Sequence, residues 1–193
     1  MKYIILFGAL IFSSLSFAKT EKAIFAGGCF WCMEQAFEEV PGVKEAVSGY
    51  IDGHKKNPTY KQVAIGATGH TEAIEITYDS TKVSFDELLV HFWKNIDPTV
   101  KDRQFCDTGS QYRSGIYYLN ASQKASSEKS FKKVNKLFKK VHTELKKATK
   151  FYVAEEYHQD YYKKNPIRYK YYKYGCGRQN TLDKVWKDKT LDS

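Results

Sequence analysis

Residues 22–33 read Lys-Ala-Ile-Phe-Ala-Gly-Gly-Cys-Phe-Trp-Cys-Met, an apolar run followed by two glycines and a cysteine. Residues 22–26 predict a strand, Gly27-Gly28 predicts a tight turn, and residues 29–39 predict a helix. A cysteine at a helix start lies near free N–H groups, whose partial positive charge stabilises a thiolate. The same passage also fits a buried structural cysteine, and by itself it supports both interpretations about equally.

The rest of the chain alternates between strand and helix patterns, without an internal repeat or a linker. Further strands are predicted at 43–51, 72–78, 115–119 and 151–153. Further helices are predicted at 84–95, where Ser84 and Glu87 form a capping box, and at 122–148. Interleaved strands and helices of this kind predict a mixed α/β or α+β fold with a central sheet.

Glu72 is the unusual residue of the strand over 72–78. The alternation places it on one face with Ile74, Ile76 and Tyr78, the face expected to meet the core. A buried carboxyl group keeps its proton to a higher pH, because burial disfavours the charged form. Glu72 also stands at the very start of the strand, and the pattern alone favours a solvated side chain there.

Four cysteines occur, at positions 29, 32, 106 and 176. Cys29 and Cys32 form a Cys-x-x-Cys pair, a spacing used in redox chemistry and in zinc sites. No second Cys-x-x-Cys and no pair of closely spaced histidines completes a set of zinc ligands. The spacing therefore favours redox chemistry over a zinc site.

Residues 1–18 are expected to lie outside the fold. They contain Lys2, a short apolar run and small residues at Ser16 and Ala18, the pattern of a secretory signal that is cut after Ala18. The apolar run is short for a bilayer span of about 20 residues, so we expect no stable membrane anchor. The expected location is periplasmic or extracellular, where disulfides persist.

The chain is basic, with 31 Lys and Arg against 22 Asp and Glu, a net charge of +9. Without Lys2, 30 basic residues remain and the net charge is +8. The lysines are scattered or follow the outer face of 122–148, which indicates solvated surface rather than a nucleic-acid site. The aromatic and basic tail at 162–193 lacks periodicity and predicts a long irregular segment that wraps the body.

Five motifs stand in order along the chain. They are GGCFWCME at 27–34, NPTY at 57–60, GHTEA at 69–73, DTGSQYRS at 107–114 and AEEYHQD at 154–160, with Asn165-Pro166 behind the last. Together they resemble the A-type peptide methionine sulfoxide reductases (MsrA) over about residues 22–166. The resemblance implies an α/β (α+β) two-layer sandwich with a ferredoxin-like core and a mixed central sheet, in one catalytic domain over 19–193.

The resemblance also implies the reaction, its nucleophile, the substrate pocket and the proton donor. Cys29 would be the nucleophile, and Phe30 and Trp31 would form the pocket for the methyl group of the substrate. Glu72 would protonate the sulfoxide oxygen, because a sulfoxide sulfur is a poor electrophile until then. A thiolate and a neutral acid must then coexist, so the site must push their pKa values in opposite directions.

Three further side chains complete the implied site. Tyr60 and Tyr112 would hydrogen-bond the sulfoxide oxygen, and Asp107 would help to order the residues around it. The implied substrates are methionine-S-sulfoxide in oxidised proteins and peptides, or the free amino acid, and the implied reductant is a thioredoxin-type dithiol. The reaction would leave a sulfenic acid on Cys29, which a second thiol condenses to a disulfide. The implied reaction needs no metal and no organic cofactor.

The identity of this resolving thiol stays open. Many members of the family carry it soon after Asn-Pro, whereas here Cys176 follows Pro166 by ten residues. Cys176 is favoured over Cys32, because the glycines on both sides of it allow a wide range of backbone conformations. Cys106 is a third and weaker candidate.

Two other functions compete with a reductase. A thioredoxin-like disulfide oxidoreductase fits a Cys-x-x-Cys pair at a helix start, but it leaves Glu72 and the tyrosine motifs without a role. A basic module for nucleic acid or heparin fits the net charge, but not the scattered lysines. The sequence favours a secreted, monomeric methionine sulfoxide reductase.

Overall fold

A six-stranded sheet forms the centre of residues 19–192, the part of the chain that the computed structural model describes. Its strands are β1 (Thr20–Gly27), β2 (Val43–Ile51), β3 (Thr71–Asp79), β6 (Ser114–Tyr118), β7 (Glu144–Lys147) and β8 (Tyr152–Val153). The helices are α1 (Phe30–Glu38), α2 (Tyr60–Ala64), α3 (Phe85–Lys94), α4 (Ala121–Leu137), α5 (Tyr161–Lys164), α6 (Pro166–Gly175) and α7 (Arg178–Val185). Two short strands, β4 (Arg103–Gln104) and β5 (Asp107–Thr108), pair apart from the sheet, and η1 (Ser110–Tyr112) and η2 (Glu156–His158) are single 3₁₀ turns. The signal predicted at 1–18 lies outside the described residues.

The strand order of the sheet is β7-β6-β1-β3-β2-β8. Its four inner strands follow the chain order β1-α1-β2-β3-α3-β6, and they pair with one another only in the antiparallel direction. This arrangement is the ferredoxin-like core implied by the resemblance. The outer strand β7 runs parallel to β6, and β8 runs antiparallel to β2, so the complete sheet is mixed as predicted.

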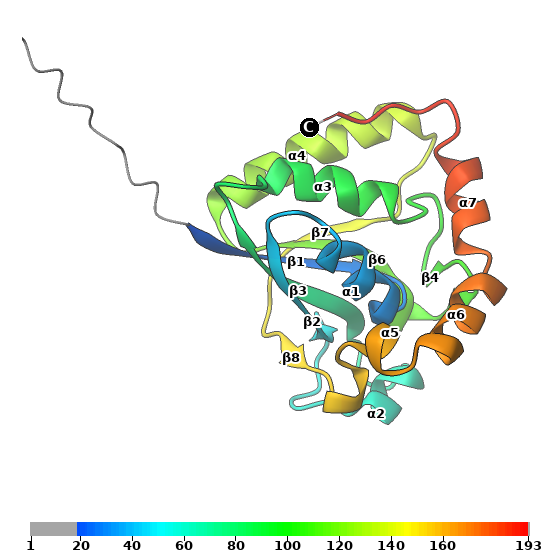
Figure 1. Ribbon diagram of the computed structural model, residues 1–193. Helices are drawn as coiled ribbons and strands as arrows, with labels where there is room; N and C mark the ends of the chain where they lie inside the picture. The colour runs from blue at the N-terminus through cyan, green and yellow to red at the C-terminus, as the bar shows by residue number, and fades with distance from the viewer. Residues whose placement is uncertain (1–18, 193) are drawn as a thin grey trace, which may run out of the picture.

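Helices α1, α3 and α4 pack on one face of the sheet, which gives two layers (Figure 1). The ring of Phe25 in β1 stacks on Phe37 of α1 and on Phe92 of α3, with ring centroids 5.4 and 5.0 Å apart. On the opposite face Ile24 belongs to a smaller cluster, against which Phe151 packs. The alternation of side chains along β1 thus separates the main core from the minor one.

The helix predicted over 122–148 is wrong in its last part. α4 ends at Leu137, and Phe138 is already extended, with φ −127° and ψ 141°. Residues 144–147 form β7 instead, which pairs with β6 so that Leu145 lies beside Ile116. The apolar spacing of these residues suits a helix, but their backbone hydrogen bonds to the free edge of β6 stabilise a strand instead.

The tail wraps the body as expected, but it is helical rather than irregular. It runs through α5, α6 and α7 from the α1 side of the molecule to α4, where the described chain ends (Figure 1). In α6, Tyr169 is buried while Tyr171 and Tyr174 are exposed. Aromatic residues on both faces of α6 hide the helical period from the sequence. Within residues 19–192 every helix is too short or too polar to cross a bilayer.

Candidate active site

Cys29 is the N-cap residue of α1. Gly28 before it has φ +83°, and a Cβ atom there would lie 2.5 Å from the Cβ of Gln104, so the turn into the helix requires glycine. The Cys29 carbonyl accepts the N–H groups of Cys32 and Met33, at 3.1 and 3.3 Å. Its side chain makes no capping hydrogen bond to the backbone of α1.

Cys29 opens onto a cavity of about 70 Å³. A cavity of this size holds the end of a side chain rather than a larger group. Its lining brings together every residue that the sequence predicted for catalysis and substrate binding, with one addition. The lining residues are Cys29, Phe30, Trp31, Tyr60, Glu72, Asp107, Tyr112 and, as the addition, Tyr172.

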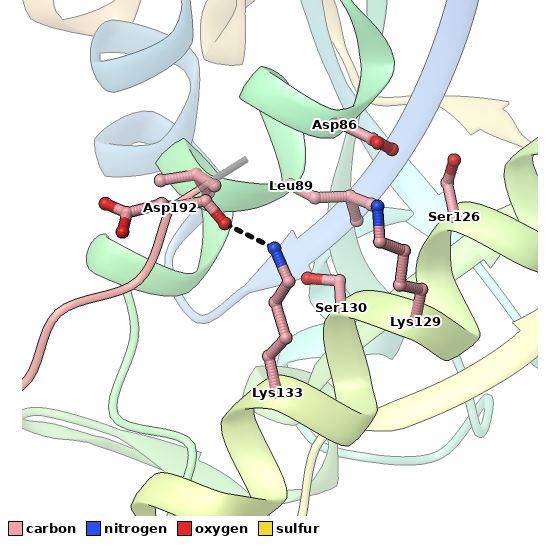
Figure 2. Close-up of a pocket in the computed structure, with 8 residues that line it drawn as sticks. Asp86, Leu89, Ser126, Lys129, Ser130, Lys133 and Asp192 are labelled. Carbon is pink, nitrogen blue, oxygen red and sulfur yellow. Dashed lines mark hydrogen bonds between the residues drawn. The ribbon is translucent and has the colours of Figure 1, made fainter.

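Another concavity lies between α3 and α4, and it is too small to hold a substrate (Figure 2). It encloses about 10 Å³, at most one water molecule. Lys133 Nζ crosses it and donates a hydrogen bond to the carbonyl oxygen of Asp192 at 2.8 Å. This contact fastens the end of the described chain to α4.

Glu72 is only 2% exposed, so the solvated side chain that the pattern alone favoured is wrong. The carboxyl group stands on the core face of β3, and its Oε2 accepts the Phe30 N–H at 3.0 Å. Burial raises the pKa of Glu72 to about 8, although this hydrogen bond opposes the shift. Glu72 therefore carries a proton at neutral pH, in the same cavity as Cys29.

Tyr60 and Tyr112 reach the cavity from two short turns. Tyr60 begins α2, and its N–H donates to Glu155 Oε1 at 2.8 Å. Tyr112 ends η1, a turn that Thr71 holds by donating its hydroxyl to the Gln111 carbonyl at 3.0 Å. Burial raises the pKa of Tyr60 to about 12 and shifts that of Tyr112 further upward, so both keep a proton to donate.

The Trp31 ring is fixed from several sides. Its Nε1 donates to His158 Nδ1 at 3.1 Å, and it stacks on Tyr161 with centroids 3.8 Å apart. Burial lowers the pKa of His158 to about 4, so this ring is neutral and accepts at Nδ1. The sequence did not single out His158 or Tyr161, although the motif at 154–160 pointed to this region.

Cys29 and Cys32 are free thiols, and both are buried. They hydrogen-bond each other; this bond and then the positive charge of Arg178 lower the pKa of Cys32 to about 6. Burial, and next the interaction with Cys32, raise the pKa of Cys29. The pair therefore shares one proton and one negative charge at neutral pH.

The other two cysteines form a disulfide, with Cα atoms 4.9 Å apart. Cys106 directly precedes Asp107, and Cys176 is the C-cap of α6, so the bond ties the Asp107 loop to that helix. The sulfur of Cys176, which the sequence favours as the resolving thiol, is bonded to Cys106, and Cys32 is the free thiol beside Cys29. The sequence could not show this disulfide, because the bond joins residues 70 positions apart. Which cysteine resolves the sulfenic acid stays a prediction.

A single family profile covers nearly all of the described chain: peptide methionine sulfoxide reductase, matched over residues 21–190. The chain belongs to this family. It is 49% identical over 174 residues to the peptide methionine sulfoxide reductase MsrA of Bacillus velezensis, an alignment that covers 89% of this chain and 98% of that protein.

Two solved structures are similar to this one. Reduced Mxr1 from Saccharomyces cerevisiae has a TM-score of 0.72 and 31% identity, covering 77% of this chain and 87% of that chain. Methionine sulfoxide reductase A of Corynebacterium diphtheriae has a TM-score of 0.70 and 36% identity, covering 79% and 78%. The predicted family and fold class are confirmed, and a thioredoxin-like disulfide oxidoreductase no longer competes. The expected lack of metal and cofactor stays a prediction.

Proposed function

We propose that this chain reduces methionine-S-sulfoxide, in oxidised proteins and peptides or as the free amino acid, to methionine. The observation that carries the proposal is that Cys29 and Glu72 line the same cavity, and that the Glu72 carboxyl group is protonated at neutral pH. The apolar rings of Phe30 and Trp31 wall the same cavity and suit the methyl group of the substrate.

In the first step the sulfoxide oxygen accepts hydrogen bonds from Tyr60, Tyr112 and Glu72. The proton of Cys29 passes to Cys32, and the Cys29 thiolate attacks the polarised sulfur. Glu72 gives its proton to the oxygen, which ends on Cys29 as a sulfenic acid while methionine leaves. The substrate sulfur is reduced and Cys29 is oxidised by the same two electrons.

In the second step Cys32 resolves the sulfenic acid. Its sulfur attacks Cys29, a disulfide forms, and the Cys32 proton leaves with the oxygen as water. A thioredoxin-type protein dithiol then reduces the Cys29–Cys32 disulfide and is itself oxidised. Every atom exchanged belongs to these two cysteines, Glu72, the substrate or the reductant, so the scheme uses no metal or organic cofactor.

The experiment that tests the function is turnover of a methionine sulfoxide peptide with dithiothreitol as reductant. The S epimer is expected to be consumed and the R epimer left. Free methionine sulfoxide serves as a second substrate. Failure to reduce the S epimer in either form contradicts the proposed reaction.

We also propose export, with residues 1–18 acting as a signal and residues 19–193 acting as one monomeric catalytic domain. Support comes from the composition of the first residues, and from a family profile that begins at residue 21. The mature protein is expected to begin at Lys19 and to occur outside the cytoplasm, without a nucleic-acid partner. Fractionation of the host followed by N-terminal sequencing tests this; full-length chain in the cytosol contradicts it.

A further inference from the structure

Helix α6 places two tyrosine hydroxyls against the two sulfurs of α1. Tyr169 and Tyr172 are three positions apart, as are Cys29 and Cys32, and all four belong to one packed cluster. Tyr172 lines the same cavity as Cys29, and Tyr169 is buried in the same cluster as Cys32. The hydroxyl of Tyr172 acts to lower the pKa of Cys29, and the hydroxyl of Tyr169 acts to lower the pKa of Cys32. The spacing of neighbours on a helix face thus matches one hydroxyl to each sulfur.

Tyr172 lies beside two groups that can accept its proton, the Asp107 carboxylate and the Cys29 sulfur. Its Oη donates to Asp107 Oδ2 at 2.6 Å, and it lines the cavity into which Cys29 opens. The edge of its ring packs on Trp31, with centroids 5.9 Å apart. A tyrosine hydroxyl has one proton to donate. While Cys29 is a thiol, that proton points at Asp107; once Cys29 is a thiolate, the same proton can turn toward the sulfur.

Tyr169 stands in the same relation to Cys32. Its Oη donates to Gln35 Oε1 at 2.7 Å, and that oxygen also accepts a hydrogen bond from Lys173 at 2.8 Å. Gln35 therefore keeps one donor if Tyr169 turns toward the sulfur. A hydrogen bond to a charged acceptor is about twice as strong as one to a neutral acceptor, which favours the turn when Cys32 carries the charge.

We propose that Tyr172 is a further catalytic residue, whose hydroxyl turns from Asp107 to the Cys29 thiolate during methionine formation, while Tyr169 serves Cys32 in the same way during resolution. The kinetic part of this proposal rests on the proposed function. The ionisation of the thiols does not, and it is measured without any sulfoxide.

The first measurement uses Cys32→Ser as background, where Cys29 is the one cysteine outside the disulfide. The rate of alkylation by iodoacetamide against pH then reports the Cys29 thiolate. Tyr172→Phe is expected to raise the midpoint by about one pH unit, a tenfold loss of thiolate at neutral pH. Tyr171→Phe is the matched control, because Tyr171 lies on the same helix and is 77% exposed; its midpoint is expected to stay unchanged.

Asp107→Asn separates a hydrogen-bond switch from a structural role. Replacing the Asp107 carboxylate by an amide removes the stronger acceptor of the Tyr172 proton. This proton can then turn to the sulfur, so the pH midpoint of Cys29 alkylation is expected to fall. Part of that shift comes from removing a negative charge, so the same change is also made in the Tyr172→Phe background. A smaller shift in that background supports the proposal. An equal shift in both backgrounds overturns it, as does an unchanged midpoint in Tyr172→Phe or an equal rise in Tyr171→Phe.

The second measurement follows one turnover in the chain with all four cysteines. Tyr172→Phe is expected to slow methionine release about tenfold, and Tyr169→Phe to slow disulfide formation more than methionine release. Equal slowing of both steps by both variants overturns the division of roles. If the wild-type chain reduces no sulfoxide but the alkylation shifts appear, the proposed function has failed while the hydroxyl–sulfur pairing stands.

Discussion

The two cysteine pairs of this chain have different surroundings and different uses. Cys29 and Cys32 stand one helical turn apart, buried among aromatic rings and tyrosine hydroxyls. Cys106 is exposed and bonded to Cys176 across 70 positions of sequence. A bond across so long a loop removes much entropy from the unfolded chain, whereas one within a helical turn removes little. The distant pair is therefore suited to hold the fold, and the adjacent pair to change its redox state in every cycle.

The largest effect expected from this comparison is that of Cys29→Ser. The hydroxyl of serine is a far weaker nucleophile than a thiolate, so reduction of the sulfoxide peptide should fall by at least two decades. The circular dichroism spectrum and the melting temperature should stay close to wild type, because oxygen replaces sulfur at a helix cap. Residual activity above a few per cent of wild type would remove Cys29 from the role of nucleophile.

The next largest effect concerns the acid that faces the adjacent pair. Glu72→Gln should slow methionine formation about 100-fold or more in a single turnover, because an amide does not replace a carboxylic acid as proton donor. Glu72→Asp should do less harm if its shorter side chain still reaches the oxygen. Equal single-turnover rates for Glu72→Gln and wild type would show that the proton comes from elsewhere.

The pH profile gives an independent reading of the same carboxyl group. The wild-type rate of methionine formation should fall above pH 8, where Glu72 loses its proton, since its pKa is about 8. The rate should also fall below about pH 6, because both Cys29 and Cys32 are then protonated and no thiolate remains in the pair. Glu72→Gln should lack the alkaline fall, and a fall of the same size in that variant would assign it to another group.

Most of the inner sheet could be predicted from sequence, because local pattern and tertiary environment agree there. The strand predicted over 43–51 is β2 with the same bounds, and the Ser84 capping box opens α3. The residues that line the cavity could be predicted because they belong to motifs that are recognisable in the sequence, although these motifs are far apart along the chain. Pattern alone failed for Glu72, because a single charged residue at a strand start carries no sign of its burial.

The tail is where sequence reasoning missed the most. Tyr172 lies among tyrosines that face both inward and outward, so nothing in the pattern marks the one that reaches Cys29. The partner of Cys176 was equally hidden, since disulfide pairing depends on the approach of two distant segments. Both failures have one cause: the position of α6 is set by packing against α1 and the Asp107 loop.

A smaller effect is expected from the distant pair. Replacing both Cys106 and Cys176 by serine should lower the free energy of unfolding by roughly 2 to 4 kcal/mol, because the unfolded chain gains the freedom of a long loop. Reduction of the sulfoxide peptide should persist below the lowered melting temperature, since Cys29 and Cys32 remain. Urea unfolding of the two proteins measures the difference. Loss of multiple turnovers with unchanged stability would instead place this pair in the catalytic cycle.

The smallest expected effect tests whether burial also raises the pKa of Glu34, another carboxyl group on the helix that carries Cys32. Glu34 of α1 is 1% exposed, and it accepts hydrogen bonds from Ser48 Oγ and the Asp160 N–H, both at 2.6 Å. Burial raises the pKa of Glu34 to about 7. Since the folded pKa lies above the unfolded one, its contribution to stability is complete below about pH 4.5 and is lost as the pH rises through 7.

Glu34→Gln cannot ionise and keeps partners for both hydrogen bonds. Its stability relative to wild type should therefore rise between about pH 4.5 and 7, by on the order of 1 to 3 kcal/mol, and then level off. Urea unfolding of both proteins at pH 5 and pH 8 measures the change. A difference that is the same at both pH values would mean that Glu34 ionises as easily in the fold as in the unfolded chain.

The proposed mechanism depends most of all on two steps: Cys29 takes the oxygen, and Cys32 resolves the resulting sulfenic acid. One equivalent of a methionine-S-sulfoxide peptide is given to the protein with Cys29 and Cys32 reduced and no external reductant, and the disulfides are mapped by mass spectrometry. The expected products are one methionine per chain, a new Cys29–Cys32 bond and an intact Cys106–Cys176 bond. Cys32→Ser should give the same methionine, with a trappable sulfenic acid on Cys29. A new bond from Cys29 to Cys106 or Cys176, or a wild-type yield from Cys32→Ser in repeated turnover with a thioredoxin-type reductant, would contradict this mechanism.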